Sequence, residues 1–195
     1  GPCLLTYPEW FDELFNTCGK NLKDYLNYKR LDPITRYFLD NKEVDVASDI
    51  NQTAINFENE LGLKKTFFLN YIKKWVSIYN ISEKIFLLNE LKFNFFFLKN
   101  AVKWIFKAGV VNIFTSMSYY NKVLRNNSVE KIMNRFATYT GSSPYQTPAF
   151  MNQLAVVEMV NGGYYPTGGI HSISKALFKL CNDVGVKFQF NHKID

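Results

Sequence analysis

A pair of adjacent glycines constrains the fold of this chain more than any other feature. Gly168 and Gly169 follow Pro166, and glycines let the backbone turn tightly and approach a ligand closely. Before the turn, residues 163–165 suit a short strand. After it, one apolar helix face is formed by Ile170, Ile173, Leu177, Leu180 and Val184. Residues 186–190 then alternate between apolar and polar side chains. The sequence therefore predicts strand, turn, helix and strand in that order.

This turn permits two interpretations. The start of a helix presents unpaired N–H groups that can face an anion or the polar edge of a ring. Two glycines before a helix are, however, more often only a tight turn. His171 is the only titratable group beside the glycines, and its place in a first helical turn favours simple exposure to solvent. From the residues alone, the tight turn is the favoured interpretation.

The rest of the chain is predicted to be α+β. Short β-like runs at 28–31, 36–39 and 44–46 are separated by turn residues, which predicts a small antiparallel meander. From Ser48 onward the pattern is helical; Leu63, Phe67, Tyr71 and Trp75 recur at every fourth residue. We place the domain boundary near Gly162, giving a mainly helical domain over 1–162 and a strand-helix-strand piece over 163–195.

Composition limits the classes of function. Hydrophobic residues make up 47% of the 195 residues, which excludes intrinsic disorder. No apolar run approaches the roughly 20 residues of a spanning helix, and no signal peptide is recognisable, so we expect a cytoplasmic chain with reduced cysteines. Two histidines and three distant cysteines predict no metal site.

The charge also has more than one interpretation. The net charge is +6, but the lysines are scattered singly, which favours solvated helix faces, with a membrane-facing patch second and no binding of nucleic acid. The segment with Phe93, Phe95, Phe96 and Phe97 is punctuated by lysines. Core packing is favoured for these phenylalanines; the alternative is that they face an apolar substrate or a membrane surface.

Three segments carry a family resemblance: the start at Gly1-Pro2, the loop Gly141-Ser142-Ser143-Pro144-Tyr145, and the turn Pro166-Thr167-Gly168-Gly169 with its helix. In this order they resemble the FAD-dependent carotenoid desaturases, the phytoene desaturase family within the flavin amine oxidase-like superfamily. The loop departs from the family pattern, with serines where Gly and Asn are usual. The glycine-rich fingerprint that holds the FAD pyrophosphate is absent, so the resemblance implies an internal piece of a longer enzyme.

The resemblance implies a function and a set of site residues. Residues 1–162 would be the substrate-binding domain and 163–195 part of a Rossmann-like FAD-binding domain, completed by the remainder of that domain. The residues that would approach the flavin are Gly1, Pro2, Tyr165, Pro166, Gly168 and Gly169. The expected reaction removes two hydrogens from phytoene or a related long apolar polyene at a peripheral membrane surface. No catalytic acid or base can be named from the sequence.

Two alternatives stay open. One is a non-catalytic module that binds an apolar ligand or a membrane surface. The other is a different flavin oxidoreductase of the amine oxidase-like superfamily, acting for example on amines. On the desaturase interpretation, this chain alone would be inactive because most of the flavin domain is missing.

Overall fold

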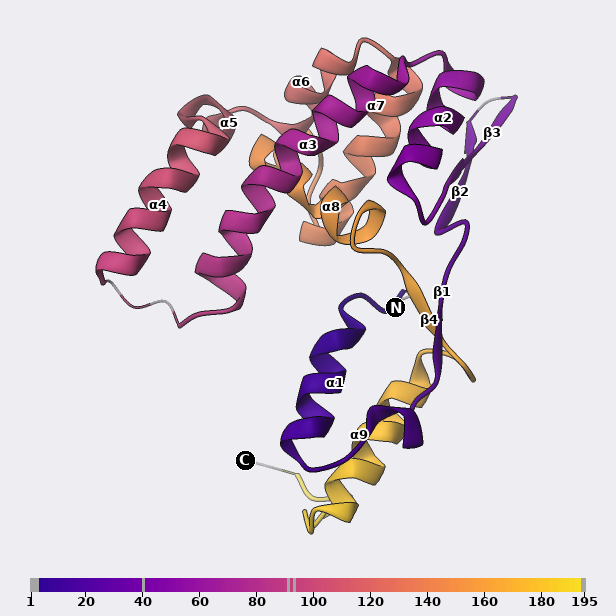
Figure 1. The fold of residues 1–195 in the computed structure, drawn as a ribbon, viewed down its shortest axis with the longest axis vertical. Coiled ribbons are helices and arrows are strands. Elements are labelled where there is room, and N and C mark those ends of the chain that lie inside the picture. Colours follow the sequence, from indigo (N-terminus) through magenta and orange to yellow (C-terminus); the bar gives the residue numbers. More distant parts are fainter. Residues whose placement is uncertain (1–3, 40, 91, 93, 194–195) are drawn as a thin grey trace. The chain divides into compact units, whose positions relative to one another are not determined.

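The computed structural model describes residues 4–39, 41–90, 92 and 94–193 (Figure 1). The chain divides into two compact units, which are described separately. Unit 1 combines residues 1–31 with residues 162–195, and unit 2 comprises residues 32–161. Helices dominate both units, and two antiparallel two-stranded sheets accompany them. The predicted α+β class is therefore confirmed.

Unit 1 joins the two ends of the chain through a short sheet. Its elements are α1 (Pro8–Thr17), η1 (Leu22–Asp24), β1 (Tyr28–Arg30), β4 (Tyr164–Pro166) and α9 (His171–Asp183). β1 and β4 pair antiparallel, with Tyr28 opposite Pro166 and Arg30 opposite Tyr164. A small core forms between α1, η1 and α9 from Phe15, Leu22, Leu26, Ala176 and Leu180.

This pairing corrects the predicted meander. Residues Tyr28–Arg30 form a strand, but its partner is β4 rather than the run 36–39, so the described residues contain no three-stranded meander. The physical reason is that backbone N–H and C=O groups of β1 need a partner, and the partner is over a hundred residues away. The two units divide the chain after residue 31 and after residue 161.

Unit 2 begins with a hairpin and continues as helices. Its strands are β2 (Thr35–Leu39) and β3 (Lys42–Val46), and Thr35 lies opposite Val46. The helices are α2 (Ile50–Leu61), α3 (Lys65–Ser82), η2 (Glu83–Leu87), α4 (Phe95–Ala108), α5 (Val110–Phe114), α6 (Met117–Asn121), η3 (Lys122–Leu124), α7 (Asn127–Asn134), η4 (Arg135–Thr140), η5 (Ala149–Gln153) and α8 (Leu154–Met159).

Local sequence explains where these helices begin and end. The Asp49 carboxylate accepts a hydrogen bond from the backbone N–H of Asn51, which caps α2. Gly62 ends that helix at a φ of 76°, a conformation that glycine adopts without strain. The apolar face of α3 supplies much of the core of unit 2, where Phe68 and Trp75 are fully buried and Phe57 packs against Phe68.

The second predicted strand of the C-terminal segment is not formed. Residues 186–190 alternate as expected, yet within the described ranges no strand pairs with them. Phe188 and Phe190 instead stack on each other and lie against Phe178 of α9. An alternating pattern becomes a strand only when a neighbouring strand accepts its hydrogen bonds.

Candidate functional site

The glycine turn lies in unit 1, between β4 and α9. Thr167 N donates to the carbonyl of Asn27 at 2.8 Å, and Gly169 N donates to that of Pro166 at 3.0 Å. Gly168 and Gly169 have φ of +85° and +87°, which L side chains rarely adopt. A Cβ on Gly168 would meet no atom within 4 Å. The backbone conformation, rather than crowding, therefore requires glycine there.

Four of the predicted flavin-site residues come together in this turn. Tyr165 is 39% exposed, and its hydroxyl lies 3.7 Å from the position that a Cβ on Gly169 would take. Pro166 is buried at the end of β4, and Gly168 is exposed. The turn thus presents open backbone next to one aromatic ring.

The other two predicted residues, Gly1 and Pro2, lie outside the described residues. The segment that follows them can be placed. Leu5 and Tyr164 exchange two backbone hydrogen bonds of 2.9 Å, which makes Leu5 a second neighbour of β4 on the edge opposite β1. The N-terminal segment and the glycine turn are therefore joined through one strand.

The turn suits contact with a flat polar ring but does not supply a dinucleotide cradle. Open glycine backbone permits close approach of a ring, and α9 begins beside it. His171 lies on the exposed side of α9, where a shallow hollow of about 410 Å³ is lined by His171, Ser174, Lys175 and Phe178. The Gly-x-Gly-x-x-Gly pattern that receives a pyrophosphate does not occur in the sequence. These residues fit one edge of an FAD site only.

The predicted aromatic segment begins α4 in unit 2. Phe95 is 81% exposed and Phe96 is 46% exposed, whereas Phe97 is half-buried. Phe93 lies outside the described residues. The core interpretation is therefore wrong for Phe95, which is almost fully exposed, and for Phe96, which is exposed over nearly half of its surface.

Trp104 holds α4 on unit 2. Its indole Nε1 donates a hydrogen bond of 2.7 Å to Ser82 Oγ at the end of α3. The ring also makes edge contacts with Phe86 and Phe150, at centroid distances of 6.4 and 5.3 Å. α3 and α4 consequently form a packed helical hairpin (Figure 1).

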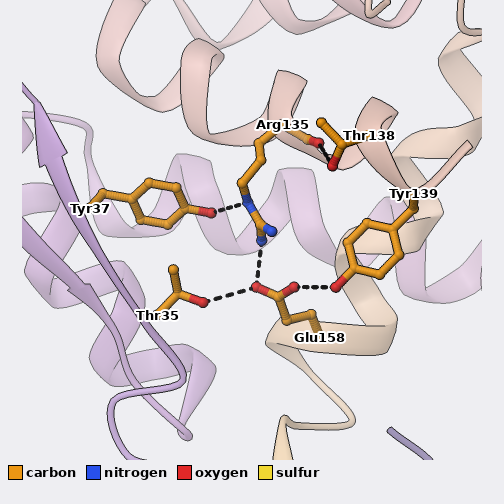
Figure 2. Close-up of polar contacts among 6 residues, drawn as sticks. All are labelled: Thr35, Tyr37, Arg135, Thr138, Tyr139 and Glu158. Carbon is orange, nitrogen blue, oxygen red and sulfur yellow. Dashed lines mark hydrogen bonds and ion pairs between the residues drawn. The ribbon is translucent and has the colours of Figure 1, made fainter. Parts of the chain in front are cut away.

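A buried carboxylate lies at the centre of a polar cluster in unit 2. Glu158 of α8 is 1% exposed (Figure 2). Its Oε1 accepts hydrogen bonds from Thr35 Oγ1 at 3.2 Å and from the Arg135 guanidinium, and its Oε2 accepts one of 2.6 Å from Tyr139 Oη. The same guanidinium donates to Tyr37 Oη. The cluster ties β2, η4 and α8 together.

The phenols of this cluster stay protonated. Burial raises the pKa of Tyr37 to about 12. Burial, together with the hydrogen bond to Glu158, raises the pKa of Tyr139 well above its ordinary value. Because both carboxylate oxygens already accept hydrogen bonds, Glu158 holds elements in place and is not presented to a substrate as an acid or base.

Sequence analysis missed this cluster, although one signal for it exists. Glu158 is the sole charged residue in the apolar stretch 154–160. A carboxylate in such a run is expected to be buried and paired. Its partners could not be named, because Thr35 lies 123 positions away along the chain.

No protein-family model matches the chain. Comparison with individual known proteins, however, finds relatives that are all named for carotenoid chemistry. A 1-hydroxycarotenoid 3,4-desaturase from a Flavobacterium species is 33% identical over 196 residues. A carotenoid 3,4-desaturase from Haloarcula japonica is 26% identical over 196 residues, and a 4,4'-diapolycopene oxygenase from a Methylomonas species is 28% identical over 200 residues. Each match covers 100% of this chain.

The chain spans about 40% of the length of these relatives. The aligned region nevertheless covers both units, because it includes the whole of this chain. The resemblance inferred from the motifs is confirmed: over its whole length, this chain is homologous to part of the carotenoid desaturases and the related carotenoid oxygenases.

Proposed function

We propose that this chain is the substrate domain and one edge of the flavin domain of an FAD-dependent enzyme that desaturates a carotenoid. The observation that carries the proposal is the 33% identity, across the entire chain, to a protein named for carotenoid 3,4-desaturation. A related carotenoid or phytoene is the substrate proposed, and the remainder of the FAD domain is the partner that completes the site.

The roles proposed for the residues follow from the glycine turn. Tyr165, Pro166, Gly168 and Gly169 would lie along the flavin ring, because the turn offers exposed backbone without side chains above it. For Gly1 and Pro2, which lie outside the described residues, contact with the flavin is proposed from the resemblance alone. Bound FAD would supply the acceptor for the hydride in the dehydrogenation.

The task of this chain would be positioning and exclusion of water. The helical unit would bind the polyene. No charged side chain is needed to pair with this substrate, because a polyene carries no charge. The non-catalytic binding module and an amine-directed flavin oxidoreductase are less favoured, because the relatives compared are named for carotenoid chemistry.

A second reaction is supported by a specific observation. Relatives from Methylomonas and Staphylococcus are named oxygenases of diapolycopene or diaponeurosporene. Insertion of oxygen into a carotenoid is therefore the competing reaction on the same class of substrate.

The proposal can be tested on the complete reading frame that contains these codons. We expect it to encode a Gly-x-Gly-x-x-Gly turn, and the expressed protein to retain FAD and convert phytoene or a hydroxylated carotenoid to a product with longer-wavelength absorption and two fewer hydrogens. A product heavier by oxygen would identify the oxygenase. A frame without the fingerprint, whose protein retains no flavin, would refute the proposal and favour the binding module.

A further inference from the structure

A hollow of unit 2 is lined by residues of α5, α6 and η3, to which the proposed function gives no individual role. Its volume is about 510 Å³. Sites that bind small molecules usually measure roughly 300–1,000 Å³. The side chains that face it without a described acceptor or salt-bridge partner, or that form its apolar wall, are Thr115, Tyr119, Tyr120, Lys122, Val123 and Arg125. The amide of Asn112 completes the lining and already donates to the carbonyl of Ala108.

The charge around the hollow has one sign. Lys122 and Arg125 are exposed cations, and none of the ion pairs between described residues includes either of them. The surrounding sequence brings no counter-charge, because no Asp or Glu occurs between Glu90 and Glu130. Two unpaired cations in one hollow attract an anion. The negative charge must therefore come from a ligand.

Tyr120 adds a donor whose direction is set by a neighbouring residue. Lys74 of α3 donates from Nζ to Tyr120 Oη at 2.6 Å and lies 4.5 Å from the centre of the Tyr120 ring. Because the phenol oxygen accepts this bond, its own O–H points elsewhere, and no described residue accepts it. Trp75 contacts the same ring edge-on, at a centroid distance of 5.1 Å. The Tyr120 hydroxyl is thus a positioned donor that a ligand in the hollow can use.

Contacts with the rest of unit 2 hold the backbone around the hollow. The carbonyl of Thr115 accepts a hydrogen bond of 2.7 Å from Ala149 N, and Tyr71 Oη donates one of 2.7 Å to Asn121 Oδ1 at the end of α6. Arg125 has a φ of 50°, so the chain turns directly after η3. A site whose backbone is already fixed loses little conformational freedom when a ligand binds.

We propose that this hollow binds a small soluble organic phosphate, a phosphate monoester on a flat ring. Guanidinium and ammonium groups donate strong charge-assisted hydrogen bonds to phosphate oxygens. Arg125, Lys122 and Tyr120 donate to the phosphate, whose charge of about −2 matches the two cations. The ring lies against Tyr119, which is 69% exposed beside Val123.

Other occupants fit the hollow less well. A carboxylate offers two oxygens to three donors and a single negative charge to two cations. A metal cation would be repelled by Lys122 and Arg125 and would find no carboxylate, imidazole or thiolate in the lining.

A lipid headgroup is the rival source of the same phosphate chemistry. No helix among the described residues is both long and apolar enough to cross a membrane, but a headgroup can be reached from the bilayer surface. The aromatic lining favours the soluble ring, because Tyr119 and Tyr120 offer ring faces and edges rather than a channel for acyl chains. The two sources are separated by the choice of probe.

The inference goes beyond the proposed function and does not depend on it. The hollow belongs to unit 2, whereas the glycine turn belongs to unit 1. Binding of a phosphate in the hollow requires neither FAD nor a carotenoid. It can therefore be measured whether or not desaturation is found, and failure of one leaves the other standing.

Calorimetric titration of the 195-residue chain with phenyl phosphate tests the site directly. At an ionic strength of about 0.15 M, where diffuse attraction is screened, we expect saturable binding of one phenyl phosphate per chain. Benzoate, which has the same ring and one charge fewer, should bind about tenfold more weakly, and phenol should show no saturable binding.

The two cations have a matched pair of variants. Lys122→Gln with Arg125→Gln should weaken binding of phenyl phosphate about 100-fold, from about tenfold for each charged hydrogen-bond donor. The control, Lys64→Gln with Lys99→Gln, removes the same charge from exposed sites outside the hollow and should change binding less than about twofold. Circular dichroism should be unaltered, because all four replaced side chains are exposed.

The phenol donor has a control of its own. Tyr120→Phe keeps the ring and removes the hydroxyl, which should weaken binding about fivefold. Tyr37 also accepts a hydrogen bond from a cation, Arg135, but it does not line the hollow. Tyr37→Phe should therefore leave binding unchanged.

Four results would overturn the inference. They are equal losses from the site and control variants, benzoate bound as tightly as phenyl phosphate, no saturable binding of phenyl phosphate, and tighter binding of dihexanoyl phosphatidic acid below its micelle-forming concentration. The last result would give the hollow to a lipid headgroup instead of a soluble phosphate. If Tyr120→Phe fails to fold, the exposed pair Lys122 and Arg125 still decides the question.

Discussion

α3 and α4 are adjacent helices of unit 2 and both are rich in aromatic residues, yet the burial of those residues differs between them. α3 buries Phe68, Tyr71 and Trp75 in the core of unit 2. α4 is also rich in aromatic residues but exposes Phe95 and Phe106 almost fully. Periodicity shows that a helix has an apolar face, but not what covers it. The difference becomes visible only when the rest of the unit is in place.

The largest change in unfolding free energy is expected for a buried aromatic residue of α3. Trp75→Ala removes a fully buried ring from α3 and should lower the free energy of unfolding by about 3–5 kcal/mol. Phe106→Ala on α4 should change it by less than about 0.5 kcal/mol, because that ring already contacts water. Urea denaturation followed by circular dichroism measures both. Similar losses would mean that the exposed face of α4 is in fact covered.

A buried ion pair should likewise contribute more to the free energy of unfolding than an exposed one. Glu158→Gln leaves Arg135 without its carboxylate partner and should cost about 3 kcal/mol of unfolding free energy. Asp45→Asn breaks the exposed pair with Arg36 and should cost less than about 1 kcal/mol. The same denaturation experiment applies, and a small effect at Glu158 would contradict the role of the cluster in holding β2, η4 and α8.

Alkaline pH should lower the stability of unit 2 through Tyr37 of the Glu158 cluster. The pKa of Tyr37 is raised to about 12 in the folded chain from the usual 10, so its contribution is fully present below pH 10. As pH rises from about 10 to 12, the unfolded phenol loses its proton first, and stability should fall by about 2 kcal/mol. Unfolding free energies at several pH values, compared between the parent chain and Tyr37→Phe, isolate this group. If the unfolding free energies of the parent chain and of the variant fall equally at alkaline pH, Tyr37 is not the group responsible.

The smallest effect is expected where α4 is anchored. Trp104→Phe keeps an aromatic ring against Phe86 and Phe150 but removes the donor to Ser82, which should cost about 1 kcal/mol. Amide hydrogen exchange should become faster in α4 and stay unchanged in α2, because the lost bond is local. Uniform acceleration in both helices would show that α4 does not open by itself.

The parts of the fold that depend on neighbouring residues were predictable from sequence. The helical run from residue 48, the end of α2 at Gly62 and the turn at Gly168 and Gly169 follow from local spacing and from the conformations that glycine allows. The α+β class follows from the same patterns.

The parts that depend on distant partners were not predictable. The strand at 28–31 was recognised, but its pairing with β4 was not, because β-propensity does not indicate which strand will be the partner. Residues 186–190 have the pattern of a strand without a described neighbour to pair with. The Glu158 cluster draws on residues as far apart as Thr35 and Tyr139, and no spacing rule connects them.

At the candidate site, too, local patterns were predictable and the exposure of side chains was not. The tight turn at Gly168 and Gly169 was predicted from the adjacent glycines, whereas the contact of its residues with a flavin stays a prediction. The exposure of Phe95 and Phe96 was judged wrongly because an aromatic run in sequence has the same appearance whether it is core or surface. Lysines at every fourth position beside it were the available signal for an exposed face.

A segment exchange tests the desaturase proposal most directly. This chain would replace the 196 aligned residues of the Flavobacterium 1-hydroxycarotenoid 3,4-desaturase, to which it is 33% identical, while the rest of that protein is retained. A substrate domain of the same kind should give a chimera that holds FAD and forms a carotenoid product with two fewer hydrogens. A chimera that folds and holds FAD, yet leaves every carotenoid offered unchanged, would contradict the proposed function.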